Sequence, residues 1–493
     1  MTGYTSDNLS LMVSKVTAGA TGALGRIKQR DGTDFSGYSS DNLTSMVEQV
    51  SAGATGALGK ISMTDASGGG SFDFNDLAGM MENIQSGTTG GLANISMSGY
   101  SSDNVSHLTT KIKSGGSGAL GDIRMSGYDH NNPGSTYTNI INFGAGVSLM
   151  GGVIQGTALS LSTVVTTLAG TAGHSGFIDA TGTNAKFSSP WAMTTDGTNL
   201  YVAESGRHII RKVVISTGVV TILAGTTSGD YGSADGTGPS DDYPPSPGFY
   251  RPRSITTDGT NLYVGDSANS TIRKIVISSG VVTTPFGVAG TSGTTDATGT
   301  SARFDYPIGI TTDGTNLYVT QGNHIIRKIV ISSGVVTTPF GVAGTSGTTD
   351  ATGTSARFNA PKGITTDGTN LYVAEYGNHT IRKIVISSGV VTTLAGSGSC
   401  GTSDGTGTSA EFCRPEKLTT DGTNIYVSDT GRQRIRKIVI SSGVVTTLAG
   451  DGTARHRDGT GTNAQFDSPR GITTDGTNLY ISDTSSHAIR KME

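Results

Sequence analysis

Four histidines recur at one place in a repeated segment, three residues before an arginine, and metal binding is the chemistry they could perform together. They are His208, His324, His379 and His487, with Ser270 and Gln433 at the same place in two further copies. Each repeated unit supplies one such residue at a turn, so neighbouring imidazoles lie too far apart to share a metal whose ligand bonds are about 2 Å. We therefore expect these histidines to bond to local backbone, and we predict no metal and no cofactor.

Arginine and an acidic residue recur on either side of the same turn. The arginines are Arg211, Arg273, Arg327, Arg382, Arg436 and Arg490, and the acidic residues are Glu204, Asp266, Glu375, Asp429 and Asp483, with Gln321 in the third copy. Paired carboxylates can serve as general acid and base. Five equivalent carboxylates, each near an arginine, fit ion pairs that brace the fold, so we predict a structural role for them.

Two loops with the sequence Asp-Gly-Thr-Gly-Thr, residues 404–408 and 458–462, have some likeness to calcium loops. Calcium takes six to eight oxygen ligands, and these loops lack the second and third acidic ligands that would supply them. Residues 280–304 and 334–358 are identical in sequence, which leaves little room for a catalytic set found in one place only. We predict that the protein is not an enzyme.

The unit that positions these residues is clearest at residues 363–396, GITTDGTNLYVAEYGNHTIRKIVISSGVVTTLAG. Four short apolar segments are separated by turn dipeptides, of which Asp367-Gly368 is typical of a tight hairpin. The turn aspartate recurs at spacings of 62, 55, 54, 54 and 54 residues, as Asp196, Asp258, Asp313, Asp367, Asp421 and Asp475. The sequence therefore predicts six units of four strands each.

Four-stranded units repeated at this period are typical of the blades of a β-propeller. Segments of the form NLYVAEYGNHTIRK, in which turn, aromatic residue, His and Arg recur in register, resemble NHL repeats over roughly residues 160–493. The resemblance implies a rigid binding platform. A few such relatives are lyases or lactonases with a metal in the central channel, so a metal-dependent propeller lyase or lactonase is our third interpretation, since fold alone does not decide function.

The two ends of the repeated region predict how the ring closes. The sixth unit ends at Glu493 and lacks the VVTTLAG strand of the other units, while an additional copy of that strand stands at residues 164–170. We predict that residues 164–169 complete the last blade, because this would remove two open sheet edges that could pair with other chains.

One connection differs from all the others, at residues 228–250, SGDYGSADGTGPSDDYPPSPGFY. Its length and the residues Tyr231, Asp241, Asp242, Tyr243 and Tyr250 predict a specific interaction surface, since long loops on rigid scaffolds often carry recognition. A solvated insertion without a partner is the alternative.

The rarest residue types mark two more positions. Trp191 follows a proline where other units have a smaller or a basic residue, and it is either buried or lines a blade face. Cys400 and Cys413 lie in the loop between units four and five at a spacing that can close as a disulfide, which fits an oxidising compartment. Two unpaired thiols are the alternative.

Composition and charge limit the classes of partner. The formal net charge is −4, and residues 160–493 balance 26 basic with 26 acidic residues, so no clustered basic excess predicts nucleic-acid binding. The N-terminus shows no secretory signal, yet the chain has 74 glycines and only 15% charged residues. We predict an extracellular or cell-surface protein whose export segment has been removed, and the alternative is a protein that stays inside the cell.

Residues 1–130 carry a different repeat in four copies, clearest at residues 37–63. Its apolar positions advance by three or four residues, at Leu43, Val47, Val50, Ala54, Leu58 and Ile61, which predicts helices. Gly19, Gly22, Gly53, Gly56 and Gly59 lie on the opposite flank. Either the helix ends near Gly53 and a short second element follows, or the glycine flank is a second packing face through which copies of the chain assemble.

The connector, residues 131–162, contains no Asp, Glu, Lys or Arg. Its apolar part is interrupted by Asn, Gln and Gly, so it does not fit a membrane span of about 20 apolar residues. β-branched and aromatic residues such as Ile140 and Phe143 predict strands, which we expect to be covered by the two domains or by another copy of the chain.

These patterns predict a mainly β protein: a small α-helical repeat region (1–130), the connector (131–162) and a six-bladed NHL-like β-propeller (163–493). Our first functional interpretation is an extracellular structural protein whose N-terminal region self-assembles into an oligomer or a filament and carries the propeller as a head. The alternative is a propeller binding module, an adhesin, that takes glycan or protein at its loops.

Overall fold

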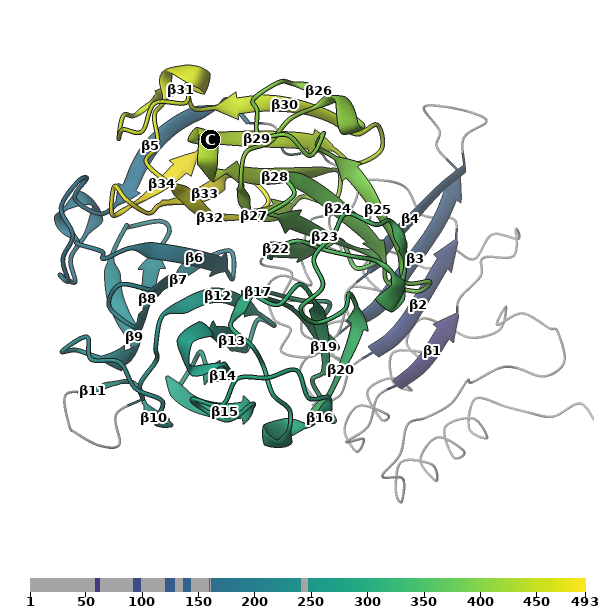
Figure 1. Ribbon diagram of the computed structural model, residues 1–493, viewed down its shortest axis with the longest axis horizontal. Helices are drawn as coiled ribbons and strands as arrows, with labels where there is room; N and C mark the ends of the chain where they lie inside the picture. The colour runs from purple at the N-terminus through teal and green to yellow at the C-terminus, as the bar shows by residue number, and fades with distance from the viewer. Residues whose placement is uncertain are drawn as a thin grey trace, which may run out of the picture. The chain divides into compact units, whose positions relative to one another are not determined.

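The structure is a computed structural model of the chain (Figure 1). It describes residues 159, 161–240 and 247–493, and the backbone of four earlier strands. These strands are β1 (Leu58–Ser62), β2 (Leu92–Ser98), β3 (Leu120–Tyr128) and β4 (Thr136–Asn142). The chain divides into two compact units, Met1–Leu149 and Met150–Glu493, and each is described by itself.

The first unit contains one sheet in the order β1-β2-β3-β4. β1, β2 and β3 pair in parallel, and β4 is antiparallel to β3. The register places equivalent residues of successive repeats side by side: Leu58, Leu92 and Leu120, and Ile61, Ile95 and Ile123. Stacking one strand per repeat in this way is typical of solenoid proteins.

The helical prediction is wrong for these strands. Leu58, Gly59 and Ile61 lie in β1, where the three- and four-residue spacing predicted a continuing helix. A five-residue segment after glycine-rich sequence is too short to sustain a helix, whereas pairing with its counterparts satisfies its backbone groups. A short second element after Gly53 agrees with β1, while Gly53 itself lies outside the described residues, as do Gly19, Gly22, Gly56 and Phe143.

The second unit is a six-bladed β-propeller, as predicted. Each blade is an antiparallel sheet whose first strand starts at a proline and lies beside the first strands of both neighbouring blades. These inner strands are β6 (Pro190–Thr195), β12 (Pro252–Thr257), β17 (Pro307–Thr312), β22 (Pro361–Thr366), β27 (Pro415–Thr420) and β32 (Pro469–Thr474). Figure 1 looks along the axis of the ring that they surround.

Three further strands follow in each blade. The second strands are β7 (Asn199–Glu204), β13 (Asn261–Asp266), β18 (Asn316–Gln321), β23 (Asn370–Glu375), β28 (Asn424–Asp429) and β33 (Leu479–Asp483). The third strands are β8 (Ile209–Val214), β14 (Thr271–Val276), β19 (Ile326–Val330), β24 (Thr380–Val385), β29 (Arg434–Val439) and β34 (Ala488–Met492). The fourth strands are β9 (Val220–Thr226), β15 (Val281–Phe286), β20 (Val335–Phe340), β25 (Val390–Ala395), β30 (Val444–Ala449) and β5 (Val164–Ala169).

A two-residue strand from a connecting loop adds a fifth member to each sheet. These strands are β10 (Gly236–Thr237), β11 (Pro239–Ser240), β16 (Ala297–Thr298), β21 (Ala351–Thr352), β26 (Gly405–Thr406) and β31 (Gly459–Thr460). They cover the outer edge of each blade, which would otherwise expose unpaired backbone groups.

The predicted closure of the ring is confirmed. β5 pairs antiparallel with β34 of the last blade, with Ala169 opposite Ile489 and Val165 opposite Met492. The backbone N–H of Glu493 also donates to the carbonyl oxygen of Val164, at 3.0 Å. The last blade is therefore built from both ends of the propeller sequence.

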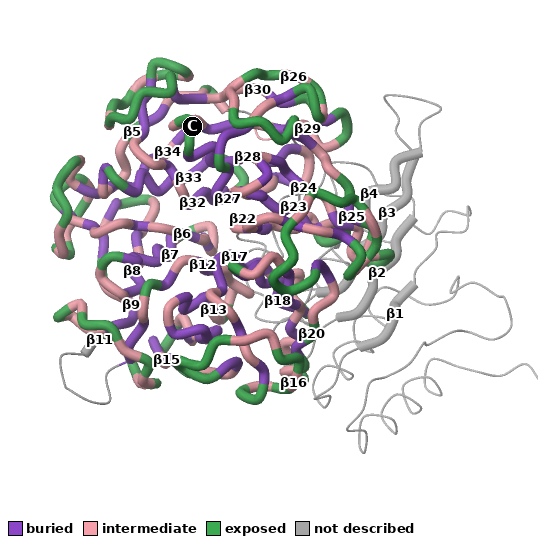
Figure 2. The backbone as a smooth tube through the Cα atoms, in the orientation of Figure 1, coloured by how far each residue is buried: buried purple, intermediate pink, exposed green. Residues whose placement is uncertain are grey.

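The apolar core lies between adjacent blades, and Figure 2 shows buried residues along the strands and exposed ones in the outer loops. One cluster joins Tyr372 and Ile381 of blade four to Leu418, Ile425 and Val427 of blade five, and all five are buried. Each fully buried aliphatic or aromatic side chain contributes about 1.5–3 kcal/mol. Because the alternating residues of every strand face one neighbour or the other, the blades stabilise each other pairwise around the ring.

The turn aspartate fixes the first hairpin of every blade. In blade four, Asp367 accepts hydrogen bonds from the backbone N–H groups of Thr369 and Asn370, and from the hydroxyl of Tyr372 at 2.7 Å. Gly368 takes a positive φ of 85°, which glycine adopts without strain. The recurring Asp-Gly and tyrosine thus serve the fold and are not candidates for a binding site.

Candidate functional site

The recurring arginines and acidic residues brace the blades, as predicted. In blade four, the buried Arg382 donates to Glu375 at 3.0 Å and to Asp350 at 2.6 Å. Its guanidinium also lies 5.3 Å from the ring centroid of Phe358. Equivalent acid contacts are made by Arg211, Arg273, Arg436 and Arg490. These five carboxylates are therefore each engaged by a buried arginine.

Blade three departs from this arrangement. Arg327 keeps the outer partner, Asp296, at 2.8 Å, but Gln321 stands where the other blades have an acid. Both amide atoms of Gln321 are buried and lack a hydrogen-bond partner within the described residues. The second hairpin of this blade is one residue shorter than its counterparts.

The four recurring histidines each tie their own blade to the next one, and the expectation of a local backbone contact is wrong in this respect. The Nδ1 atom of His379 accepts a hydrogen bond of 3.1 Å from the backbone N–H of Arg414, in the loop that leads into blade five. The same contact joins His208 to Arg251, His324 to Ala360 and His487 to Ser189, and Gln433 makes it with Ser468. Burial lowers the pKa of His208, His379 and His487.

No group of three or more His, Cys, Asp or Glu side chains suited to a metal occurs in the described part of the chain. The aspartates of the two loops that resembled calcium loops are engaged by arginine instead. Asp404 lies 2.9 Å from Arg436, and Asp458 lies 2.7 Å from Arg490. Within the same residues, no helix is long and apolar enough to cross a bilayer.

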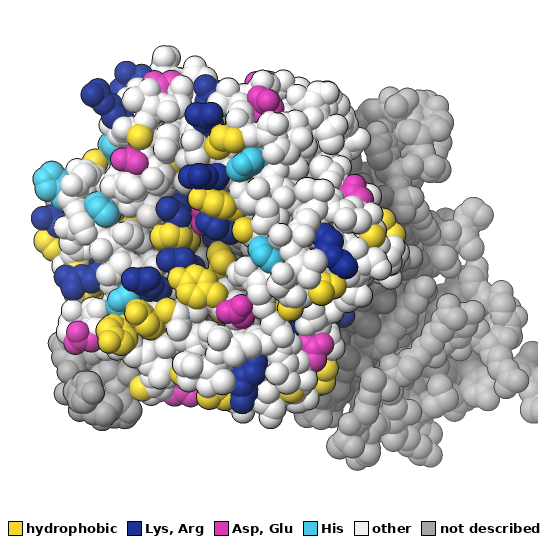
Figure 3. All heavy atoms as spheres, viewed as in Figure 1, with side chains coloured by type: hydrophobic (Ala, Val, Ile, Leu, Met, Phe, Trp, Pro, Cys, Tyr) yellow, Lys and Arg dark blue, Asp and Glu magenta, His cyan; other side chains and the backbone are white. Residues whose placement is uncertain are grey.

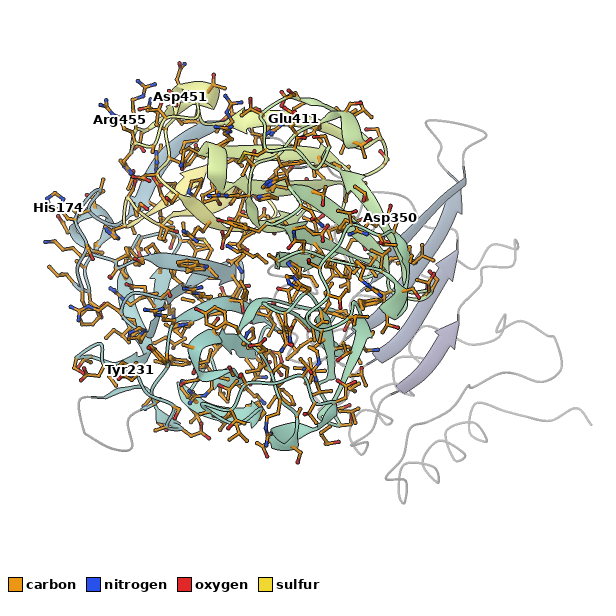
Figure 4. The ribbon with its side chains drawn as sticks, viewed as in Figure 1. His174, Tyr231, Asp350, Glu411, Asp451 and Arg455 are labelled. Atoms are coloured by element: carbon orange, nitrogen blue, oxygen red, sulfur yellow. A yellow bond between two sulfur atoms is a disulfide. The ribbon has the colours of Figure 1, made fainter. Side chains whose placement is uncertain are left out.

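The long divergent loop brings two of its predicted residues together. Tyr231 and Tyr250 stack with ring centroids 4.5 Å apart, and His208 packs edge-on against Tyr250 at 5.5 Å. Tyr231 is 67% exposed and lies at the outer rim of the ring (Figure 4). Asp241, Asp242 and Tyr243 lie outside the described residues.

The two cysteines form a disulfide in the structure, between Cys400 and Cys413. The backbone N–H of Cys413 also donates to Asp429 at 2.7 Å. This hydrogen bond therefore fastens the loop that leads into blade five to the acidic residue of the ion pair that braces this blade.

A group of charged and aromatic side chains lies at the axis of the ring, and we call it the axial cluster. Six of its members directly follow the proline that starts each inner strand, and the seventh, Lys417, comes one residue later: Trp191, Arg253, Ile308, Lys362, Glu416, Lys417 and Arg470. Figure 3 shows Lys and Arg side chains gathered with hydrophobic ones over the middle of this face.

Trp191 is the centre of the aromatic contacts in the axial cluster. The guanidinium carbons of Arg470 and Arg253 lie 3.8 Å and 4.3 Å from its ring centroid, from the two blades that flank it. Arg253 also lies 5.1 Å from the ring of Tyr306, and the ammonium of Lys362 lies 3.3 Å from the ring of Tyr376. Contacts of this kind are worth about 0.5–2 kcal/mol each, and more when shielded from water.

Glu416 is the one carboxylate of the axial cluster. It is buried and lies 3.0 Å from Lys362 and 3.4 Å from Arg470. Lys417 is also buried, and its Nζ donates to the carbonyl oxygen of Ile308, two blades away, and to that of Lys362. Burial lowers the pKa of Lys417 to about 7, and burial also lowers the pKa of Lys362. Four basic side chains thus accompany one acidic side chain.

Trp191 is the one member of this cluster that stands out in the sequence, where its place in the fold could not be predicted. One sequence pattern could have identified the whole set. In all six units the inner strand begins with proline and ends with Thr-Thr, while the residue directly after the proline changes from unit to unit. What the sequence could not supply is that all six inner strands start at the same face and meet at the axis.

Comparison with known proteins agrees with this fold. The human NHL repeat-containing protein 2 is 28% identical over 242 residues, which cover 44% of this chain and 33% of that protein. Its chicken counterpart is 25% identical over 345 residues, covering 62% of this chain and 46% of that protein. Residues 163–493 form an NHL-repeat β-propeller.

The NHL propeller also has counterparts among solved structures. An auxiliary nutrient binding protein from Bacteroides thetaiotaomicron shares 17% sequence identity, with a TM-score of 0.51 over 76% of this chain and 83% of the other. At this identity the likeness shows the fold alone. No protein-family model matches the sequence. The chain spans less than half the length of either NHL repeat-containing protein 2.

Proposed function

We propose that the NHL propeller is a non-enzymatic module that binds a small ligand of the glycan class at its axial cluster. One observation carries this proposal: the positions that hold the ring together repeat from blade to blade, whereas the residue after the inner-strand proline does not. The six blades have Trp, Arg, Ile, Lys, Glu and Arg there. A position that served only the ring would have no reason to vary among units that are otherwise near copies.

The chemistry of the axial cluster supports a small polar ligand. Flat aromatic faces from Trp191, Tyr306 and Tyr376 lie among charged groups, and ligand sites commonly combine aromatic walls with a few polar groups that orient the ligand. The nutrient-binding propeller of similar fold is an analogy in the same direction.

A panel of immobilised neutral and acidic glycans tests this proposal with the full chain. We expect binding that is lost in the triple variant Arg253→Gln, Lys362→Gln, Arg470→Gln and kept in Tyr231→Ala, whose side chain lies in the rim loop. Loss of glycan binding in Tyr231→Ala, with binding kept in the triple variant, would place the site in the loop of residues 228–250. No binding to any glycan would reject the proposal.

An extracellular or cell-surface location is part of the same proposal. The disulfide between Cys400 and Cys413 supports it, because disulfides persist in oxidising compartments. Detection of the oxidised pair in protein taken directly from its native cells, after trapping free thiols, would agree with this location. Fully reduced cysteines would argue against it.

Self-association through the N-terminal unit is a second proposal, for which the sheet offers one supporting observation. Equivalent residues of successive repeats stack in parallel from β1 to β3, and within the described strands the outer edge of β1 has no partner. An unpaired edge can accept a strand from another chain. Light scattering after size exclusion, with electron microscopy, tests this: a monomer across the micromolar range without fibres would reject it.

A further inference from the structure

Three hydrogen-bond donors of the axial cluster lack acceptors. The indole N–H of Trp191 and the Nε–H groups of Arg253 and Arg470 are buried, and none of them has a hydrogen-bond partner within the described residues. The Nε–H groups of the bracing arginines also lack a partner, so an unpaired Nε–H group alone does not indicate a ligand site. What distinguishes the axial cluster is the unpaired indole N–H of Trp191 together with the two guanidinium groups beside its ring. A buried polar group without a partner costs about 1–3 kcal/mol, which makes an unfilled acceptor position expected here.

The charges of the axial cluster also favour the binding of an anion. Arg253, Lys362, Lys417 and Arg470 face one carboxylate, and Glu416 is already engaged by Lys362 and Arg470. No described carboxylate forms an ion pair with Arg253, whereas every bracing arginine has at least one acidic partner. An excess of partly buried positive charge is stabilised by an anion, and guanidinium groups are well suited to bind planar oxyanions through two hydrogen bonds.

We propose that the axial cluster binds an oxyanion, the carboxylate of an acidic sugar, held by the side chains of Trp191, Arg253 and Arg470. This inference rests on the proposed function and narrows it, because a neutral glycan would leave both the donors and the charges uncompensated. The sugar's carboxylate accepts hydrogen bonds from the indole and from the two guanidinium groups. Lys362 and Lys417 add long-range attraction without direct contact being required.

Isothermal titration calorimetry of the full chain with three probes tests the inference: D-glucuronate, D-glucose and inorganic sulfate. We expect glucuronate to bind, glucose to bind at least tenfold more weakly, and the affinity for glucuronate to fall as salt concentration rises. Equal binding of both sugars would overturn the oxyanion inference and leave the proposed function standing. Binding of sulfate with no binding of glucuronate would keep the oxyanion site and reject the glycan class. No binding of glucuronate or sulfate would overturn the inference.

Two variants identify the donors, with a matched control. Trp191→Phe keeps an aromatic ring but removes the indole N–H together with the five-membered ring, and we expect about tenfold weaker binding of glucuronate, since hydrogen bonds to charged groups are worth about 1.5–3 kcal/mol. Arg253→Gln should weaken binding by at least as much. Lys383→Gln removes one positive charge from β24, away from the axial cluster, and should change the affinity less than twofold. Thermal melting verifies that each variant is folded, and unchanged affinity in Trp191→Phe and Arg253→Gln would overturn the assignment.

Discussion

The Nδ1 atom of His487 accepts a hydrogen bond of 3.2 Å from the backbone N–H of Ser189, so the last blade is tied to the first across 298 residues of sequence. To accept at Nδ1, the imidazole must be neutral and carry its proton on Nε2. Gln433 makes the equivalent contact in blade five with an amide oxygen that does not titrate, at 2.7 Å. The chain therefore contains its own control for the role of histidine.

Replacing His487 by Gln should change how stability depends on pH. Burial lowers the pKa of His487 in the folded protein below its value of about 6.5 in the unfolded chain. The unfolded state then binds more protons in this window, so stability is complete above about pH 6.5 and falls as pH drops below it. We expect His487→Gln to be as stable as the parent at pH 8 and more stable at pH 5.5, measured by urea unfolding. His487→Ala should lose about 1 kcal/mol at pH 8. Equal losses in the Gln and Ala variants would show that the hydrogen bond does not matter.

Replacing Val165 by Ala tests whether β5 stabilises the last blade as much as the fourth strands of the other blades stabilise theirs. Val165 in β5 and Val391 in β25 occupy the same place in their blades, and both are buried. Each Val→Ala change should therefore reduce the free energy of unfolding by a similar amount, about 2 kcal/mol, from lost burial and the remaining cavity. Guanidinium unfolding of the two variants gives the comparison. A loss below about 0.5 kcal/mol for Val165→Ala alone, against about 2 kcal/mol for Val391→Ala, would mean that β5 is dispensable.

The two acidic partners of Arg382 should differ in their effect on stability. Glu375 is buried, whereas the Asp350 side chain is 46% exposed (Figure 4). Glu375→Gln leaves a buried guanidinium with half of its counter-charge removed and should cost about 3 kcal/mol. Asp350→Asn, at a site open to water, should cost about 1 kcal/mol or less. Thermal unfolding at neutral pH and at two salt concentrations measures both, and a larger loss for Asp350→Asn would contradict the assignment.

Lys417→Met should remove a pH-dependent cost from the axial cluster. Burial lowers the pKa of Lys417 to about 7, against about 10.4 for an unfolded lysine. Between these values the unfolded state binds more protons, so the contribution of this group to stability rises with pH from about 7 to about 10. We expect Lys417→Met to be more stable than the parent at pH 7, with the difference shrinking at pH 9.5. A difference that does not change with pH would show that Lys417 is not perturbed by burial.

Much of the fold could be predicted because every local signal repeats six times. The Asp-Gly turns, the strand alternation and the isolated VVTTLAG copy before Asp179 all agreed on one closed ring. The N-terminal unit could not be predicted in the same way, because Leu58 and Ile61 suit a helix by spacing and a strand by pairing. The pairing register between repeats decides whether such a segment forms a helix or a strand. This register cannot be read from the spacing of residues within one repeat.

The candidate site was harder to predict for a physical reason. Arg253, Lys362 and Arg470 are each ordinary surface residues in their own unit, and their proximity to Trp191 follows only from ring closure. The histidines were misplaced by the same limitation, since their partners lie 35 to 43 residues ahead in the next blade or, for His487, at the start of the ring. Sequence patterns within one blade do not contain contacts between blades.

Trp191 is the only tryptophan of the chain, so its fluorescence reports directly on the axial cluster. The most direct test of the proposed site is a titration of full-length protein with D-glucuronate while this emission is recorded, with D-glucose as the control. The account predicts a saturable change in intensity or wavelength with glucuronate that is lost in Arg253→Gln, and little change with glucose. Emission that stays constant while calorimetry records glucuronate binding would place the ligand elsewhere and contradict the account.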